Sequence, residues 1–372
     1  MAPALALGAD AGLLERVARR ALGDPGAEVV DVEVAETGYA FTSIATGGLH
    51  RVSGTAVTRR GTCRWSAFVK VLNHPRHWPL IGLLPPGAAA ELVDLFPWRD
   101  EIDARDQVLP VLPAGLRVPD QYAVVELGDD RVAWWMEDVE AVDDEWSDED
   151  YASTARLLAR LAAHRGPRDA AGVCPLPPGL AIRKLVESRG PGLVAVLDDD
   201  ALWARPVVTD TVDPTFRRDL RRAAATLPAL LHELGTLPTA LPHGDAAPVN
   251  LLRPRQEPGT VVAVDMAFRC QLPLGHDLGQ LLVGEVARGR GDPDRLPELL
   301  EVVERAYLEG LADEGVEVPR EVVHRGMVCS SLGPRTLPDA FPVDGLADPV
   351  DTGFLRRRAA LGRFVIDQVL AA

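Results

Sequence analysis

Two neighbouring segments of the 372-residue chain decide its fold class: PHGDAAPVNLL (residues 242–252) and VVAVDMAF (residues 261–268). The first contains one glycine and two prolines, which favour a loop, and it places Asp245 and Asn250 five positions apart. The second begins as an apolar run of the strand type and then reaches Asp265. Together they predict a loop and a strand that present two carboxylates and one amide.

These three side chains have the groups that phosphoryl transfer needs. One carboxylate accepts the proton of the attacking hydroxyl, while an amide oxygen and a second carboxylate hold Mg²⁺ against the nucleotide phosphates. We therefore predict Asp245 as the catalytic base and Asn250 and Asp265 as ligands of Mg²⁺. The alternative is that all three are ordinary turn residues, since turns use Gly, Asp, Pro and Asn. The chain contains only two asparagines, Asn73 and Asn250, which argues against coincidence.

The loop resembles the catalytic loop of the aminoglycoside phosphotransferase family, which reads His-Gly-Asp-x-x-Pro-x-Asn. All five fixed positions of that motif are matched, by His243, Gly244, Asp245, Pro248 and Asn250. The family is a branch of the protein-kinase-like fold, and its members transfer phosphate from ATP to small molecules. The resemblance therefore implies an ATP-dependent small-molecule kinase.

The segment after the loop, VDMAFRCQLPLGHDLGQLL (264–282), also resembles the family. There a metal-binding Asp precedes a turn, and an Asp-Leu pair opens the next helix; Asp265 and Asp277 take these places. In this interpretation Asp277 braces the catalytic loop from the start of its helix. Met266 stands where an aromatic residue is frequent, and Ala246 and Ala247 replace bulkier residues. These differences concern the substrate pocket more than the catalytic groups.

The resemblance implies an α+β, bilobal protein-kinase-like fold. The N-terminal lobe, residues 1–138, would hold an antiparallel or mixed sheet with one helix and clamp the nucleotide against a larger, mainly helical lobe, residues 139–372. Strand-like runs separated by glycine-bearing turns support the first lobe and cover residues 28–34, 40–45, 51–57, 65–72, 122–127 and 131–139. Helical patterns cover residues 98–109, 151–165, 216–234, 296–313 and 353–371, and residues 172–212 are predicted to form an insertion.

Lys70 is a lone charge on the apolar strand WSAFVKVL and one of only two lysines in the chain. Its burial is costly unless the ammonium group meets anions. The resemblance implies that this lysine reaches the nucleotide phosphates and pairs with a glutamate of the next helix. Glu101 is the best partner by position, with Asp100 and Asp103 as neighbours on the same helix. The alternative is an edge-strand lysine that points to water.

The segment TGGLHRVSG (46–54) is predicted to form a turn between two strands. Its glycines would let backbone N–H groups approach phosphate oxygens, which makes Thr46, Gly47 and Gly48 candidate phosphate-binding residues. Glycines also join strands in most sheets, and the segment matches neither a Walker loop nor the full glycine pattern of protein kinases. Both interpretations stay open.

Residues 134–139, WWMEDV, lie where the lobes of the family join. The resemblance implies that main-chain groups there, at Glu137 and Val139, hydrogen-bond the adenine edge. An acidic run extends through residues 137–150. It could attract a cationic substrate such as an aminoglycoside, or it could be an ordinary solvated linker.

The composition excludes several classes of protein. The net charge is -16, which opposes binding to a nucleic-acid backbone. The four cysteines form no close pairs, so neither a zinc ribbon nor a dense disulfide framework is predicted. Neither a secretory leader nor a run of about 20 apolar residues is found, so no membrane association and a cytoplasmic location are expected.

Two other functions are compatible with parts of the sequence. One is a nucleotide-binding pseudokinase that serves as a partner or scaffold; the presence of all the catalytic residue types argues against it. The other is a metal-dependent phosphohydrolase using the adjacent His276 and Asp277, which requires an all-helical site with further histidines upstream. The acceptor itself stays open among aminoglycosides, other antibiotics, choline, amino alcohols and sugars, as do the choice of ATP or GTP and the oligomeric state.

Overall fold

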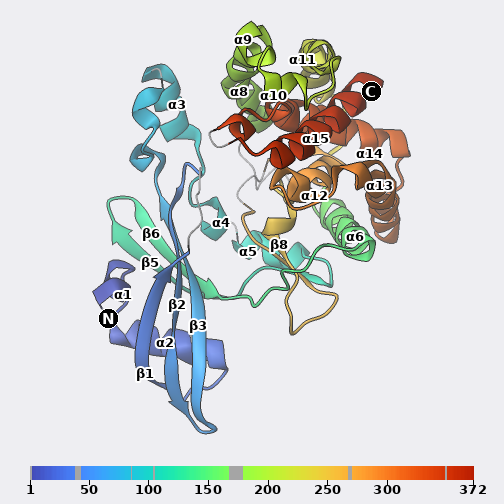
Figure 1. Cartoon of the computed structure of the whole chain (residues 1–372). Helices are drawn as coiled ribbons and strands as arrows, with labels where there is room; N and C mark the ends of the chain where they lie inside the picture. Colours follow the sequence, from blue (N-terminus) through green and yellow to red (C-terminus); the bar gives the residue numbers. More distant parts are fainter. Residues whose placement is uncertain are drawn as a thin grey trace. The chain divides into compact units, whose positions relative to one another are not determined.

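The structure is a computed structural model that describes residues 2–37, 43–84, 86–103, 105–166, 179–266, 270–347 and 350–372. The chain divides into two compact units (Figure 1). Unit 1 comprises Met1–Asp106, Val118–Ala141 and Pro254–Gln256, and unit 2 comprises Gln107–Arg117, Val142–Arg253 and Glu257–Ala372. The functional boundary that we predict between residues 138 and 139 stays a prediction.

Unit 1 is built on a five-stranded antiparallel sheet with the strand order β1-β2-β3-β6-β5 (Figure 1). Its strands are β1 (Glu28–Glu36), β2 (Thr46–Thr58), β3 (Gly61–Asn73), β5 (Gln121–Gly128) and β6 (Arg131–Glu137). Along β3, Trp65, Ala67 and Val69 are buried on one face, so the next side chain, Lys70, points to the opposite face. This alternation separates the apolar core from the predicted nucleotide-binding lysine.

Helix α2 (Ala11–Leu22) packs against the face of the sheet that carries the core. It begins at Asp10, whose carboxylate accepts the N–H of Leu13 at 2.7 Å, and it ends at Gly23, whose φ of 60° favours glycine. Leu13, Leu14, Val17 and Ala18 form its buried stripe. The other α-helices among the described residues of this part of the chain are α1 (Ala2–Ala6), α3 (Pro86–Leu95), α4 (Asp100–Asp103) and α5 (Arg105–Val108).

The predicted fold class, an antiparallel sheet followed by a mainly helical part, is confirmed. One strand prediction is wrong. Residues 43–45 of the predicted strand 40–45 lie outside any strand, and residues 40–42 lie outside the described part. The predicted helix 98–109 is helical over its described residues Asp100–Asp103 (α4) and Arg105–Val108 (α5), and Pro97 and Trp98 precede its first turn.

Unit 2 is mainly helical (Figure 1). The α-helices of its described residues are α6 (Asp148–His164), α8 (Leu180–Asp198), α9 (Asp200–Trp203), α10 (Pro206–Thr209), α11 (Phe216–Glu233), α12 (His276–Ala287), α13 (Leu296–Asp313), α14 (Arg320–Met327) and α15 (Thr352–Ala371). A π-helix spans Val328–Thr336. Two small sheets complete the unit: β10 (Leu272–Pro273) pairs with β7 (Thr239–Ala240), and β9 (Val261–Ala263) pairs with β4 (Leu116–Arg117) and β8 (Leu251–Leu252).

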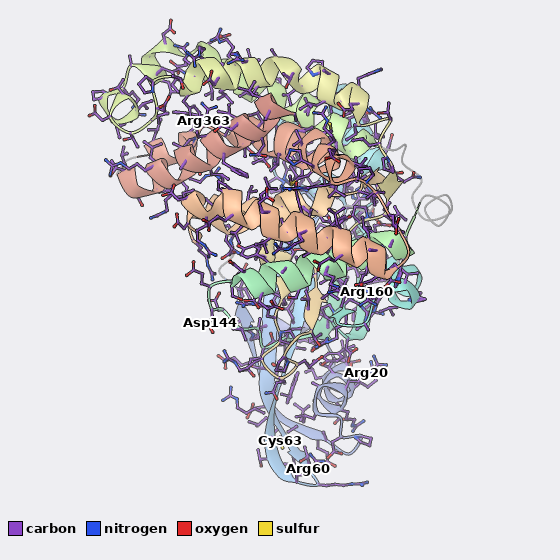
Figure 2. The ribbon with its side chains drawn as sticks, turned by 90° about the vertical axis from the view of Figure 1, so that its right-hand side faces the viewer. Arg20, Arg60, Cys63, Asp144, Arg160 and Arg363 are labelled. Carbon is purple, nitrogen blue, oxygen red and sulfur yellow. The ribbon has the colours of Figure 1, made fainter. Side chains whose placement is uncertain are left out.

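Helices α6 and α13 pack closely against each other. A Cβ atom at Gly310 would lie 2.4 Å from the carbonyl oxygen of Arg156, so only glycine permits this approach. Arg160 of α6, labelled in Figure 2, donates to Glu314, just beyond α13, at 2.6 Å. No helix among the described residues is both long and apolar enough to cross a membrane.

Helix α12 lies in the centre of unit 2 and is buried along most of its length. A Cβ atom at Gly284 would lie 2.6 Å from Pro248, and one at Gly279 would lie 2.3 Å from the hydroxyl of Ser331. The two glycines therefore let the loop that contains Asp245 and the π-helix pack closely on the same helix. This packing positions the candidate site.

Candidate functional site

The loop predicted to be catalytic joins β7 to β8 and ends in a single 3₁₀ turn, Pro248–Asn250. Strand β8 pairs with β9, with Leu251 opposite Ala263. The N–H of Val264 then donates to the carbonyl oxygen of Asn250 at 2.9 Å. Asn250 and Asp265 thus lie at the same end of two paired strands, so the strand pairing brings their backbones together.

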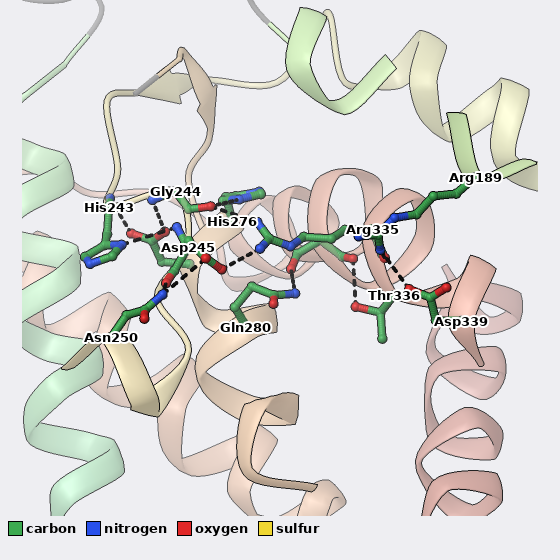
Figure 3. A network of polar contacts seen from close by, with 12 residues as sticks. Arg189, His243, Gly244, Asp245, Asn250, His276, Gln280, Arg335, Thr336 and Asp339 are labelled. Carbon is green, nitrogen blue, oxygen red and sulfur yellow. Dashed lines mark hydrogen bonds and ion pairs between the residues drawn. The ribbon is translucent and has the colours of Figure 1, made fainter. Parts of the chain in front are cut away.

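Asp245 is held by donors at both carboxylate oxygens (Figure 3). Its Oδ2 accepts from the Nδ2 of Asn250 at 3.1 Å, and the same amide donates to the main-chain oxygen of Asp245 at 2.9 Å. Its Oδ1 accepts from the guanidinium group of Arg335. The Asp245 side chain is still 24% exposed, so a hydroxyl group can reach it.

Asp277, the second residue of α12, fixes the backbone of the loop. Its carboxylate accepts the N–H groups of His243 and Gly244, both at 2.8 Å, and is almost completely buried. Burial raises the pKa of Asp277, while these two hydrogen bonds act in the opposite direction. Gly244 has a φ of 88°, a conformation that favours glycine. The predicted bracing contact is confirmed.

His276, the first residue of α12, is also directed at the loop (Figure 3). Its Nε2 lies 3.3 Å from the carbonyl oxygen of Gly244, and its Nδ1 lies 2.9 Å from the hydroxyl of Ser330. Burial lowers the pKa of His276 to about 3, so the ring is neutral near pH 7. Both residues of the His-Asp pair therefore support the loop.

The phosphohydrolase interpretation is not supported. Over the described ranges there is no group of three or more His, Cys, Asp or Glu side chains that could hold a metal ion. His276 and Asp277 contact the loop that contains Asp245 instead, and the first unit of the chain contains a sheet where that interpretation required helices.

In unit 1, Lys70 pairs with Glu101 of α4. The Lys70 Nζ lies 2.6 Å from the Glu101 Oε2, and the two side chains are 10% and 6% exposed. The predicted partner is therefore correct, whereas the neighbouring Asp103 lies near Arg99 at the surface. The alternative of an edge-strand lysine pointing to water is wrong, because β3 lies between β2 and β6 and the side chain is buried.

The segment 46–54 is not a turn. It forms the first two thirds of β2 and pairs with β3, with a bulge between Thr46 and Gly48. A Cβ atom at Gly47 would lie 2.1 Å from the side chain of Asn73, so this glycine permits a close approach within the sheet. The joining segment is instead residues 37–45, of which 38–42 lie outside the described part. The phosphate-binding role of Thr46, Gly47 and Gly48 stays a prediction.

The predicted adenine-binding positions lie at the end of β6 and just beyond it. The N–H of Glu137 donates to the carbonyl oxygen of Asp120 at 2.9 Å, so this donor already has a partner inside unit 1. Val139 lies between the end of β6 and an isolated bridge that joins Ala141 to Pro254. The role of Glu137 and Val139 toward a nucleotide stays a prediction.

Comparison with known proteins gives a result only at the level of structure. No family model and no curated protein matches the sequence. An aminoglycoside phosphotransferase from Alicyclobacillus acidocaldarius superposes with a TM-score of 0.50 at 16% identity, over 92% of this chain and 93% of that one. The chain has the aminoglycoside-phosphotransferase fold. A spectinomycin phosphotransferase in complex with ADP and spectinomycin also matches, with a TM-score of 0.50 at 11% identity and 97% of each chain covered.

Within this aminoglycoside-phosphotransferase fold, Arg335 is the site residue that sequence reasoning missed. Its guanidinium group donates to the carbonyl oxygen of Gly244 at 2.9 Å and to the carboxylate of Asp245 (Figure 3). Arg335 follows Asp245 by 90 positions and belongs to no local motif. Arginines are abundant in this chain, so nothing in the sequence distinguishes this one.

Proposed function

We propose that the protein is an ATP-dependent kinase of small molecules that transfers the γ-phosphoryl group to a hydroxyl of its acceptor. The observation that carries this proposal is the arrangement around Asp245. A partly exposed carboxylate sits on a loop braced by Asp277, with Asn250 hydrogen-bonded to it and paired through its backbone with the residue before Asp265. The fold shared with a phosphotransferase that binds ADP and spectinomycin adds support.

In this proposal the acceptor hydroxyl donates its hydrogen to the carboxylate of Asp245. The acceptor oxygen then attacks the γ-phosphorus, the bond from phosphorus to the oxygen bridging to the β-phosphate breaks, and ADP leaves. The proton of the hydroxyl passes to Asp245 and later to solvent. Asp245 contributes mainly by orienting the hydroxyl toward the phosphorus, since phosphoryl transfer depends largely on positioning.

Asn250 and Asp265 fit a site for Mg²⁺. The amide nitrogen of Asn250 is already used on Asp245, which orients the amide so that its oxygen is the atom available to a cation. One amide oxygen and one carboxylate suit an ion that completes its shell with water and phosphate oxygens. When bound, Mg²⁺ would neutralise charge on the nucleotide phosphates.

The buried pair of Lys70 and Glu101 fits a role in nucleotide binding. Two opposite charges in a weakly solvated position are costly to desolvate, so the pairing of Lys70, on an apolar stretch of β3, with Glu101 of α4 favours a function. We assign Lys70 to the phosphates and Glu101 to holding its ammonium group. Further nucleotide-binding positions in this proposal are the segment Thr46–Gly48 and the main chain of Glu137 and Val139. The lobe boundary of the proposal lies between residues 138 and 139, so that the lobes are residues 1–138 and 139–372.

The test is release of ADP from ATP in the presence of Mg²⁺, measured for wild type and Asp245→Asn. The acceptor panel comprises aminoglycosides, choline, amino alcohols and sugars. Turnover that an acceptor stimulates, and that Asp245→Asn abolishes, would establish the activity and the acceptor class. Binding of ATP with no transfer to any acceptor or to water would favour a pseudokinase, and the absence of ATP binding would refute the proposed site.

A further inference from the structure

We infer that Arg335 is a positioning residue for the base of the reaction, acting through Asp245; this inference rests on the function proposed above. The two terminal nitrogens of its guanidinium group have separate tasks. Nη1 donates to the carbonyl oxygen of Gly244 at 2.9 Å, and Nη2 donates to Oδ1 of Asp245. One rigid, planar group thus spans the backbone and the side chain of the catalytic loop.

Arg335 restrains the rotation of the Asp245 carboxylate. The terminal torsion of an aspartate is broad, so an unsupported carboxylate samples many orientations. Here Arg335 holds Oδ1 while Asn250 holds Oδ2, and the two donors come from different elements of unit 2 (Figure 3). A carboxylate oxygen can accept two hydrogen bonds. Each oxygen of Asp245 can therefore still accept a hydrogen bond from the hydroxyl group that is to be phosphorylated. The contacts therefore orient Asp245 without preventing its role.

The backbone that carries Arg335 is anchored. It is the penultimate residue of the π-helix Val328–Thr336, whose residues 328–334 are all buried. Such wide helical turns are rare and occur frequently at functional sites. A Cβ atom at Gly333 would lie 2.7 Å from Leu230, and Ser331 lies against Gly279 of α12. The π-helix and the loop pack on the same helix, so the distance between Arg335 and Asp245 is determined by the core.

The geometry distinguishes positioning from a simple surface ion pair. The Arg335 side chain is only 17% exposed, so its contact with Asp245 is less screened than an exposed pair. It also shares the Gly244 carbonyl with the neutral ring of His276. A lysine at this position would present one nitrogen on a flexible stem and could not reproduce the two parallel contacts.

The experiment compares Arg335→Ala, Arg335→Gln and Arg335→Lys with wild type in the ADP-release assay, using the best acceptor of the panel. Where no acceptor stimulates turnover, water serves as acceptor and ATP hydrolysis is measured. We expect kcat to fall about 100-fold in Arg335→Ala and about 10-fold in Arg335→Lys, with KM for ATP changed less than about twofold. Added methylguanidinium should restore part of the activity of Arg335→Ala and none of that of Asp245→Asn.

Arg189→Ala is the matched control. Arg189 of α8 donates to the carbonyl oxygen of Arg335 at 3.3 Å and to Asp339, and its side chain makes no contact with Asp245. Its kcat should stay within about twofold of wild type. Arg335→Gln retains a donor toward Gly244 and serves if Arg335→Ala fails to fold.

Two results would overturn the inference. One is a wild-type kcat in Arg335→Ala or Arg335→Gln. The other is a loss of activity that follows the loss of folded protein, measured by circular dichroism, and that methylguanidinium does not restore. If wild type transfers phosphate neither to an acceptor nor to water, the proposed function fails and this inference fails with it.

Discussion

The ammonium nitrogen of Lys70 lies 2.6 Å from Oε2 of Glu101, and both side chains are at least nine-tenths buried. Lys70 comes from the middle of the sheet and Glu101 from the short helix α4, so the pair joins two elements of unit 1. Burial of both charges makes each dependent on the other.

Glu101→Gln should therefore destabilise the protein and weaken nucleotide binding. The substitution breaks a buried ion pair, and we expect the free energy of unfolding to fall by about 3 kcal/mol in urea titrations. Asp103→Asn is the control on the same helix, because Asp103 is 60% exposed and lies 3.6 Å from Arg99. Its effect should be below about 0.5 kcal/mol. Equal effects of the two substitutions would contradict a special role of Glu101.

The substitution Asp277→Asn should separate the structural support of the loop from the chemistry that we assign to Asp245. The amide can accept one of the two N–H groups of the loop, but its own NH₂ then faces the other donor, so one buried N–H loses its acceptor. We expect unfolding to become easier by about 1–3 kcal/mol, and kcat to fall because Asp245 is displaced. Circular dichroism and steady-state kinetics below the melting temperature measure the two effects.

The matched control for Asp277→Asn is Asp219→Asn. Asp219 is also a buried carboxylate of unit 2, but it lies on α11 and contacts Arg218 and Arg363. The substitution Asp219→Asn should reduce stability and leave kcat of the folded protein unchanged. An unchanged kcat in Asp277→Asn as well would show that the bracing contact does not matter for Asp245.

Asn250→Ala should weaken Mg²⁺-dependent nucleotide binding. The substitution removes the amide oxygen that we assign to the ion and the two hydrogen bonds to Asp245. Calorimetric titration with ADP, at several Mg²⁺ concentrations, should show half-maximal binding at about 10-fold more Mg²⁺. ADP affinity in the absence of Mg²⁺ should be unaltered. The same Mg²⁺ dependence in wild type and variant would exclude Asn250 as a ligand.

Stability should depend on pH through His276. Burial lowers its pKa from 6.5 to about 3, so between these values the unfolded chain binds one more proton than the folded protein. Unfolding therefore becomes easier as the pH falls through this window, by up to about 1.4 kcal/mol per pH unit from this group. His276→Gln removes the contribution, so its curve of unfolding free energy against pH should be flatter.

The neighbouring Asp277 contributes to the pH dependence of stability with the opposite sign. Burial raises its pKa above 3.8, so the folded state retains a proton that the unfolded chain loses, and stability declines as the pH rises through that range. Asp277 is present in both wild type and His276→Gln, so the difference between their curves isolates His276. Parallel curves between pH 6.5 and 3 would contradict a buried, neutral His276.

Two contacts around the candidate site were predicted correctly from the sequence, whereas the roles of the site residues stay predictions. The resemblance to the phosphotransferase family implied both: a partner for Lys70 on the next acidic helix, and a bracing role for Asp277 at the start of α12. The predicted turn at 46–54 failed because its glycines permit close packing inside β2, and glycine has the same appearance in a turn and in a crowded strand. Helix α2 was not predicted, although its N-cap residue Asp10 and its apolar stripe can both be recognised in the sequence.

The sequence by itself determined the groups that surround the proposed reaction: Asp245 and Asn250 on one short loop and Asp265 after the next strand. The spacing of these residues is enough to predict that they lie near one another, because the geometry of a loop and an adjoining strand depends on residues a few positions apart. Only the tertiary structure decided that Arg335, 90 positions after Asp245, holds its carboxylate. That contact depends on how α12, the loop that contains Asp245 and the π-helix pack, and close packing at Gly279 and Gly284 is a property of the whole core.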